Sequence, residues 1–118
     1  MVESKTLDRA DQTRTFDRGK VDVSTLGTHS VGRINLEPGW SWSSCVKPIV
    51  GGDLCQAAHV GYLLQGRLGV RMDDGAEYQI KAGDAYSIAP GHDGWVEGDQ
   101  SVVGVEFESL RDYAKPRS

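Results

Sequence analysis

The strongest constraint on the fold is a series of short segments in which apolar and polar residues alternate, each ended by turn residues. A two-residue alternation indicates strands rather than helices. The segments that show it are KVDVSTLG (20–27), HSVGRINLEPG (29–39), WSWSSCV (40–46), HVGYLLQG (59–66), RLGVRM (67–72), EYQIKAG (77–83), DAYSIAPG (84–91) and SVVGVEF (101–107). Turn pairs such as Asp74–Gly75, which favours a hairpin, separate them. Only the tail, 107–118, has room for a helical turn, before Pro116. Many short strands in one chain predict an all-β sandwich or barrel.

The chain length of 118 residues fits a single domain. We expect an N-terminal arm over residues 1–12, a barrel over 13–110 and a C-terminal tail over 111–118. The net charge of −4 argues against nucleic acid and anionic membrane surfaces as partners. No apolar run is long enough to span a membrane, and the charged N-terminus does not resemble a secretory signal. These features predict a cytoplasmic protein, in which Cys45 and Cys55 stay reduced.

Two stretches resemble the motifs of the cupin superfamily. PGWSWSSCVKP, followed by HVGYLLQGRLGV, is similar to the first motif, and AGDAYSIAPGHDGW is similar to the second. Together with the strands between and after them, they cover about residues 38–107. The resemblance implies a single-domain, cupin-like jelly-roll β-barrel of the small bacterial type. It also implies a divalent metal inside the barrel.

The metal ligands of typical cupins are a His-x-His pair, a glutamate and a later histidine, and this chain substitutes them. The glutamate position falls on His59. The His-x-His pair falls on Cys45 and Lys47 when residues are counted forward from Gly39, or on Asp53 and Cys55 when they are counted back from His59. The later histidine falls on Gly94, with His92 two residues before it and on the same face of a strand. The resemblance therefore suggests a metal site drawn from Cys45, Cys55, His59 and His92, with Asp53 as an alternative.

The chemistry of these side chains favours particular metals. Strand parity places Cys55, Ala57, His59 and Gly61 on one face, so Cys55 and His59 can share a cavity. Thiolate and imidazole ligands favour zinc first and iron second. Four ligands would close the site, whereas three would leave a position for water or substrate. Asp53 with the two histidines would instead resemble a two-histidine, one-carboxylate iron site.

Other readings of the same residues remain open. The cysteines can be small buried apolar residues, and His92 can bond to the backbone alone. Trp40 and Trp42 share one face of the expected strand and Cys45 the other, so both faces cannot point inward without a bulge. Tyr62, Tyr86 and Arg33 are further candidates for the polar groups of a pocket.

The resulting functional hypothesis is a cupin that binds a divalent metal and binds or transforms a small molecule in the barrel cavity. An isomerase or a dioxygenase would be examples, and no catalytic residue is assigned. The alternative is a metal-free module that binds or senses a small molecule without chemistry. We also expect a homodimer, because an arm and short sheets leave edges to be covered.

Overall fold

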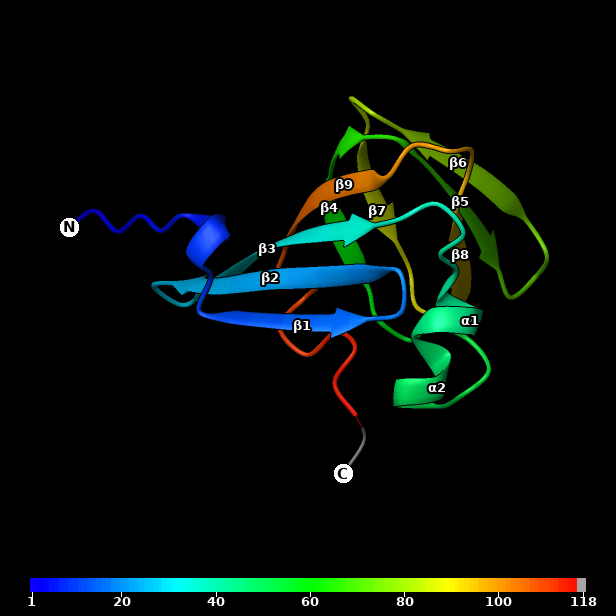
Figure 1. Ribbon diagram of the computed structural model, residues 1–118, viewed down its shortest axis with the longest axis horizontal. Coiled ribbons are helices and arrows are strands. Elements are labelled where there is room, and N and C mark those ends of the chain that lie inside the picture. Colours follow the sequence, from blue (N-terminus) through cyan, green and yellow to red (C-terminus); the bar gives the residue numbers. More distant parts are fainter. Residues whose placement is uncertain (117–118) are drawn as a thin grey trace.

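The computed structural model describes residues 1–116, which form two antiparallel sheets, with two short helices near one end and a 3₁₀ turn near the N-terminus at the other (Figure 1). The larger sheet has the strand order β1 (Gln12–Phe16), β2 (Gly19–Leu26), β3 (His29–Leu36), β9 (Val102–Phe107), β4 (His59–Gln65) and β7 (Ala85–Ile88). The smaller sheet has the order β6 (Glu77–Lys81), β5 (Arg67–Met72) and β8 (His92–Val96). The helical segments are η1 (Leu7–Arg9), α1 (Trp42–Cys45) and α2 (Lys47–Val50).

The predicted all-β class is confirmed, but the sheets do not close into a barrel. Every ladder within residues 1–116 lies inside one sheet or the other. The isolated bridges Ser41–Trp95 and Cys55–His92 attach the connecting segments to β8. The predicted hairpin at Asp74–Gly75 does join β5 and β6, with Gly75 at a φ of 89°.

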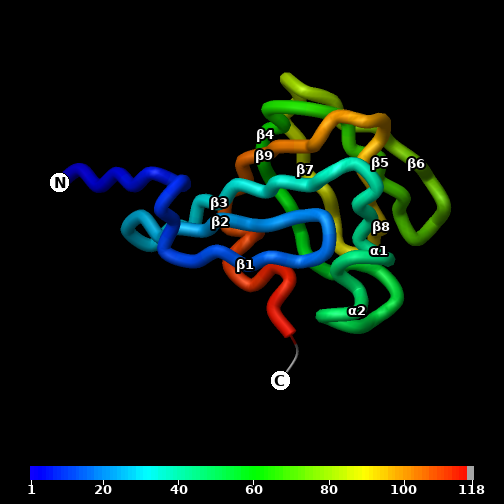
Figure 2. The backbone as a smooth tube through the Cα atoms, in the orientation of Figure 1, coloured from blue at the N-terminus to red at the C-terminus, as the bar shows by residue number. Residues whose placement is uncertain are grey.

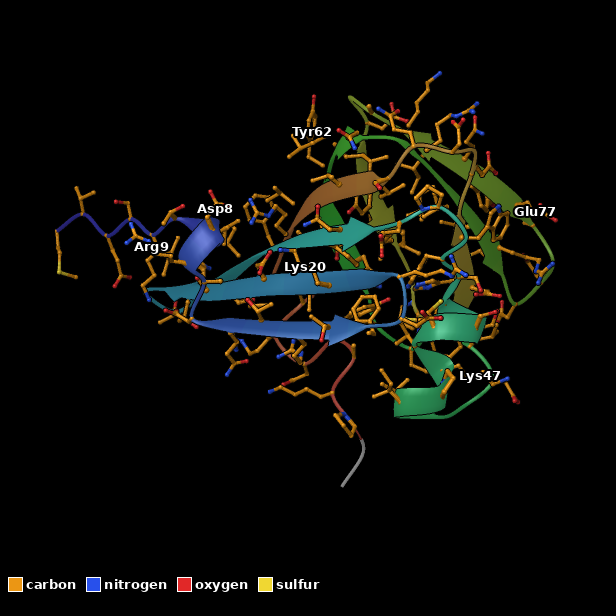
Figure 3. All side chains as sticks on the ribbon, viewed as in Figure 1. Asp8, Arg9, Lys20, Lys47, Tyr62 and Glu77 are labelled. Carbon is orange, nitrogen blue, oxygen red and sulfur yellow. The ribbon has the colours of Figure 1, made fainter. Side chains whose placement is uncertain are left out.

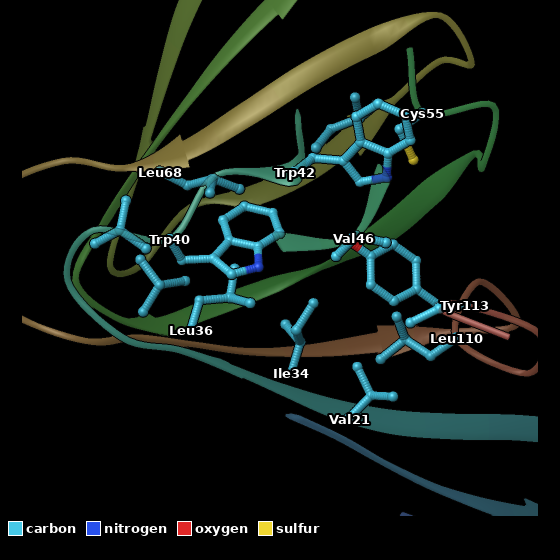
Figure 4. Close-up of a cluster of buried hydrophobic side chains, with 14 of the residues drawn as sticks. Val21, Ile34, Leu36, Trp40, Trp42, Val46, Cys55, Leu68, Leu110 and Tyr113 are labelled. Carbon is cyan, nitrogen blue, oxygen red and sulfur yellow. The ribbon is translucent and has the colours of Figure 1, made fainter. Parts of the chain in front are cut away.

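The core lies between the sheets and arises from the alternation read in the sequence. In β4, the buried residues His59, Gly61 and Leu63 alternate with exposed ones, and β9 buries Val102 and Glu106 toward the same interior. Figure 4 shows how side chains from β2, β3, β5 and the helical segments meet there. The face of β4 that carries His59 is therefore the interior face of the fold.

The strand predicted over 40–46 is wrong, because most of that segment forms α1. Ser41 caps the helix through its side chain, which accepts a hydrogen bond from the Ser44 amide at 3.2 Å. Trp42 and Cys45 lie three residues apart and so occupy one helical face, and both are buried. Trp40, just before the helix, is buried as well. The helix removes the conflict that a regular strand would have imposed on the tryptophans and Cys45.

The C-terminal segment, residues 108–116, packs against the body of the fold beside β1 (Figure 2). Leu110, Tyr113 and Ala114 are buried. Arg14 on β1 donates hydrogen bonds to the carbonyl oxygens of Leu110, Arg111 and Tyr113 at 2.6, 3.0 and 2.7 Å. These bonds hold Tyr113 inside the molecule.

Across residues 1–116, we find no helix with the length and apolar character needed to cross a membrane.

Candidate metal centre

Cys55, His59 and His92 converge at one point inside the fold. Each offers a ligand atom, and these atoms lie within 4.8 Å of one another. All three residues are buried, with exposures of 4 to 7%. His59 begins β4 and His92 begins β8, while Cys55 lies in the segment that leads to β4. The Cys55 amide donates to the His92 carbonyl at 2.7 Å, and the His92 amide donates back at 3.2 Å. Backbone pairing therefore fixes the thiol beside the second histidine.

A hydrogen bond at Nδ1 orients the imidazole ring of each histidine. His92 Nδ1 lies 2.7 Å from the Ala89 carbonyl oxygen, which can only accept, so Nδ1 carries the hydrogen. His59 Nδ1 lies 2.6 Å from Glu106 Oε1, and the carboxylate likewise assigns a hydrogen to Nδ1. In both rings Nε2 is then the atom available for a ligand bond. His59 Nε2 lies 3.9 Å from Cys55 Sγ.

Glu106 on β9 is the buried charge that supports this arrangement. Its Oε1 accepts hydrogen bonds from His59 and from Ser109 Oγ, the latter at 2.7 Å, and its Oε2 accepts one from Tyr86 at 2.7 Å. Burial alone would raise the carboxyl pKa, but the contacts with His59 outweigh it and lower the pKa of Glu106. Glu106 is therefore a carboxylate at neutral pH.

The thiol and the imidazole of His59 stabilise each other's charged forms. Burial acts to raise the pKa of Cys55, yet hydrogen bonds from His59 and His92 lower it to about 6. Burial acts to lower the pKa of His59, and its contacts with Cys55 and Glu106 instead raise it to about 10. Without a metal, the pair is thus a thiolate and an imidazolium at neutral pH. A thiolate is the form of cysteine that binds metals.

Two spaces border the donors. An inner cavity of about 40 Å³, large enough for only a few water molecules, is lined by His59, His92 and Glu106 and by mostly apolar side chains. An outer pocket of about 200 Å³ is lined by Cys55 together with residues of α1, α2 and the C-terminal segment. Trp42 and Tyr113 line both spaces. The donor group therefore lies at the boundary between the two.

Tyr113 contacts the centre from the C-terminal segment. Its ring packs edge-on against His59, with 5.6 Å between ring centroids. Burial, followed by the negative charges of Cys55 and Glu106, raises the pKa of Tyr113 well above its ordinary value. Its hydroxyl thus stays protonated and able to donate a hydrogen bond.

The structure brings together three of the four metal ligands suggested by the sequence. Cys45 lies apart on α1, where its buried thiol donates to Asp17 Oδ2 at 3.7 Å. Asp53 is exposed and outside the group. Of the other polar candidates, Tyr86 lines the inner cavity and Tyr62 is exposed on the outer face of β4.

Sequence reasoning missed Glu106 and Tyr113. The signal for Glu106 was present, because it shares strand parity with Val102 and Gly104 and so places an acid on an apolar, inward face of SVVGVEF. Tyr113 had no such signal, since it lies in a segment without periodicity.

The donors fit a divalent metal by their chemistry. One thiolate and two imidazole Nε2 atoms are the ligand types that zinc and ferrous iron accept in proteins. The hydrogen bonds at both Nδ1 atoms give the orientation that metal-binding histidines commonly have.

Comparison with known proteins gives a likeness in structure alone. No family model matches the sequence, and no curated protein matches it. Among solved structures, oxalate decarboxylase of Lactobacillus farciminis, in a formate complex, is 19% identical with a TM-score of 0.58 over 90% of this chain and 31% of its own. The chain thus spans about a third of that enzyme.

Two further solved structures match most of both chains. The polyketide cyclase RemF of Streptomyces resistomycificus is 15% identical, with a TM-score of 0.63 over 91% of this chain and 78% of its own. An RmlC-like cupin of Shewanella frigidimarina is 16% identical, with a TM-score of 0.52 over 80% of each chain. At these identities the likeness concerns the fold. This chain has a cupin-like fold.

Proposed function

We propose that the protein binds one divalent metal ion through Cys55 Sγ, His59 Nε2 and His92 Nε2, and uses the site to bind or transform a small molecule. Zinc is the first choice and iron the second, because one ligand is a thiolate and two are imidazoles. The observation that carries the proposal is the convergence of these three buried donors within 4.8 Å.

The surrounding residues suit this role. Glu106 keeps a proton on Nδ1 of His59, which leaves Nε2 as the donor, and Tyr86 and Ser109 hold the carboxylate in place. Apolar walls around the inner cavity exclude bulk water from the centre. When bound, the metal supplies Lewis acidity at a site with three protein ligands and thus room for another.

The proposal is tested by the metal content of protein purified without chelator. We expect about one zinc or iron per chain, because the three donors form one site. Cys55→Ser and His92→Ala should each lower the stoichiometry strongly. Cys45→Ser is the matched control, since it removes an equally buried thiol outside the donor group and should leave the stoichiometry unchanged.

Cobalt substitution gives an independent spectroscopic readout. A thiolate–cobalt bond produces a charge-transfer absorption that should be present in Cys45→Ser and absent in Cys55→Ser. Protein that holds no metal, and whose thermal stability is the same with and without added zinc, would contradict the proposal.

A further inference from the structure

The outer pocket beside Cys55 is the feature that the proposed metal site leaves unexplained. Cys55 belongs to the donor group and also lines this pocket of about 200 Å³. His59 and His92 line the inner cavity instead, which at about 40 Å³ holds no organic molecule. Of these two spaces, the outer pocket is the one large enough to admit an organic molecule to the donors.

The lining of the outer pocket defines the kind of molecule it fits. Its walls are mainly apolar and come from the helical segments and the loop that follows them; examples are Val46, Val50, Leu54 and Ala57. At the rim, Lys115 and Asp112 pair with each other at 3.0 Å, so the mouth presents no net charge. Ligand pockets commonly have volumes of roughly 300–1,000 Å³. This pocket is smaller, so it fits a correspondingly compact molecule with a mostly apolar body.

Two polar groups are available where the pocket meets the donors. Trp42 and Tyr113 border both spaces, and within residues 1–116 neither the indole N–H nor the phenol hydroxyl has a hydrogen-bond partner. Figure 4 shows the indole nitrogen on the side of the Trp42 ring nearest Cys55, with the Tyr113 ring reaching in from the C-terminal segment. Two donors that have no protein partner can bind a ligand that brings oxygen acceptors.

We propose that the outer pocket is the substrate subsite, and that it takes a compact molecule with an apolar body and one oxygen-bearing head group. The head group lies between Trp42 and Tyr113, directed at the donor group, and the body lies against the wall formed by α2 and the loop 51–57. This inference rests on the proposed metal function and names the class of molecule that reaches the metal.

The test uses cobalt-loaded protein and two probes with the same metal-binding head. Acetohydroxamate carries a methyl group and benzohydroxamate a phenyl ring, and binding of either is followed by the change in the cobalt spectrum. We expect benzohydroxamate to bind about tenfold more tightly or better, because its ring is buried in the pocket. Equal affinities would overturn the proposal.

A pair of variants on α2 localises the effect. Val50→Trp fills the part of the pocket beside α2 and should abolish the preference for benzohydroxamate while leaving cobalt stoichiometry unchanged. Ile49→Trp is the matched control, since Ile49 is also half-buried on α2 but does not line the pocket. A preference that survives in Val50→Trp would place the phenyl ring elsewhere and refute the subsite.

A metal-free arm separates failure of the pocket from failure of the metal site. Benzyl alcohol added to protein stripped of metal should shift the backbone amide resonances of residues 54–57 and 112–115, and not those of β5 and β6. If cobalt does not bind but these shifts occur, the metal function fails and the pocket stands. If cobalt binds and the shifts are absent, the pocket is wrong.

Discussion

Glu106 keeps a negative charge in the interior because three neighbouring groups, His59, Tyr86 and Ser109, compensate for the lost water. Three hydrogen bonds satisfy its oxygens, and the positive charge of His59 faces it. Removing one partner of a buried charge pair is costly, because the other charge is left without compensation. Glu106 and His59 are therefore interdependent, and changes at Glu106 should alter metal binding at the candidate centre.

Glu106→Gln should weaken metal binding about 10- to 100-fold, because the amide no longer holds His59 in the orientation that presents Nε2. Competition with a chelating dye measures the affinity. Glu108→Gln serves as the control, since that side chain is half-exposed and contacts only His29, Arg111 and the Ser30 amide. Equal affinity in the Glu106 variant and the wild type would contradict this role.

Cys55 should titrate with a midpoint of about 6 in the metal-free protein. The thiolate takes up a proton as the pH falls through that value, so its ultraviolet absorbance should be present above it and lost below it. The measurement uses Cys45→Ser, which leaves Cys55 as the single thiol. Adding His59→Gln should move the midpoint upward, because the positive charge is removed. A midpoint near the ordinary value of about 8.5 would show that the pair does not form.

At the scale of the element, most strands are predictable from the sequence and the helical segments are not. β2 to β7 and β9 follow the alternation of apolar residues, which reports directly on which face is buried. WSWSSCV shows the same alternation and yet forms α1, because capping by Ser41 and packing of Trp42 and Cys45 outweigh a pattern of only seven residues. Local periodicity cannot reveal such tertiary effects.

The position of the C-terminal segment depends on Arg14. Its hydrogen bonds join residues about a hundred positions apart in the sequence. Arg14→Gln should lower the free energy of unfolding by about 1–3 kcal/mol, because hydrogen bonds from a charged donor to carbonyl oxygens are lost. Amide hydrogen exchange in residues 110–115 should also accelerate. Arg9→Gln, at an exposed position on η1, should change neither. Unchanged exchange in the Arg14 variant would mean that packing alone retains the segment.

At the scale of the whole molecule, the sequence predicted a cupin-like fold and three residues that the structure brings together in the candidate metal centre. Strand parity predicted Cys55 and His59 on one face, although β4 begins only at His59 and Cys55 reaches the candidate site from the preceding loop. The choice between Cys45 and Cys55 could not be made from spacing, because it depends on how α1, α2 and the loop 51–57 are folded. Tyr113 enters through long-range packing that no local pattern encodes, whereas the parity of β9 carried a signal for Glu106.

The expected homodimer remains a prediction, and the outer face of β4 gives it a location. Val60, Tyr62 and Leu64, with Phe107 on β9, are each 44 to 53% exposed, and Tyr62 projects outward in Figure 3. An apolar patch of this kind is typical of an interface. Sedimentation should give twice the 12.8 kDa chain mass, and Tyr62→Glu should give the monomer. Tyr78→Glu, at an exposed tyrosine on β6, should leave the dimer intact. A wild-type monomer would exclude this assembly.

The paired amides and carbonyls of Cys55 and His92 have a consequence for how such a centre can change over evolution or by design. Main-chain atoms alone set the spacing between these two positions, so the spacing does not depend on which side chain occupies position 55. A softer or harder donor can therefore be exchanged there without rebuilding the scaffold. The backbone therefore determines where the ligand atom lies, and the side chain at position 55 determines which metal it favours.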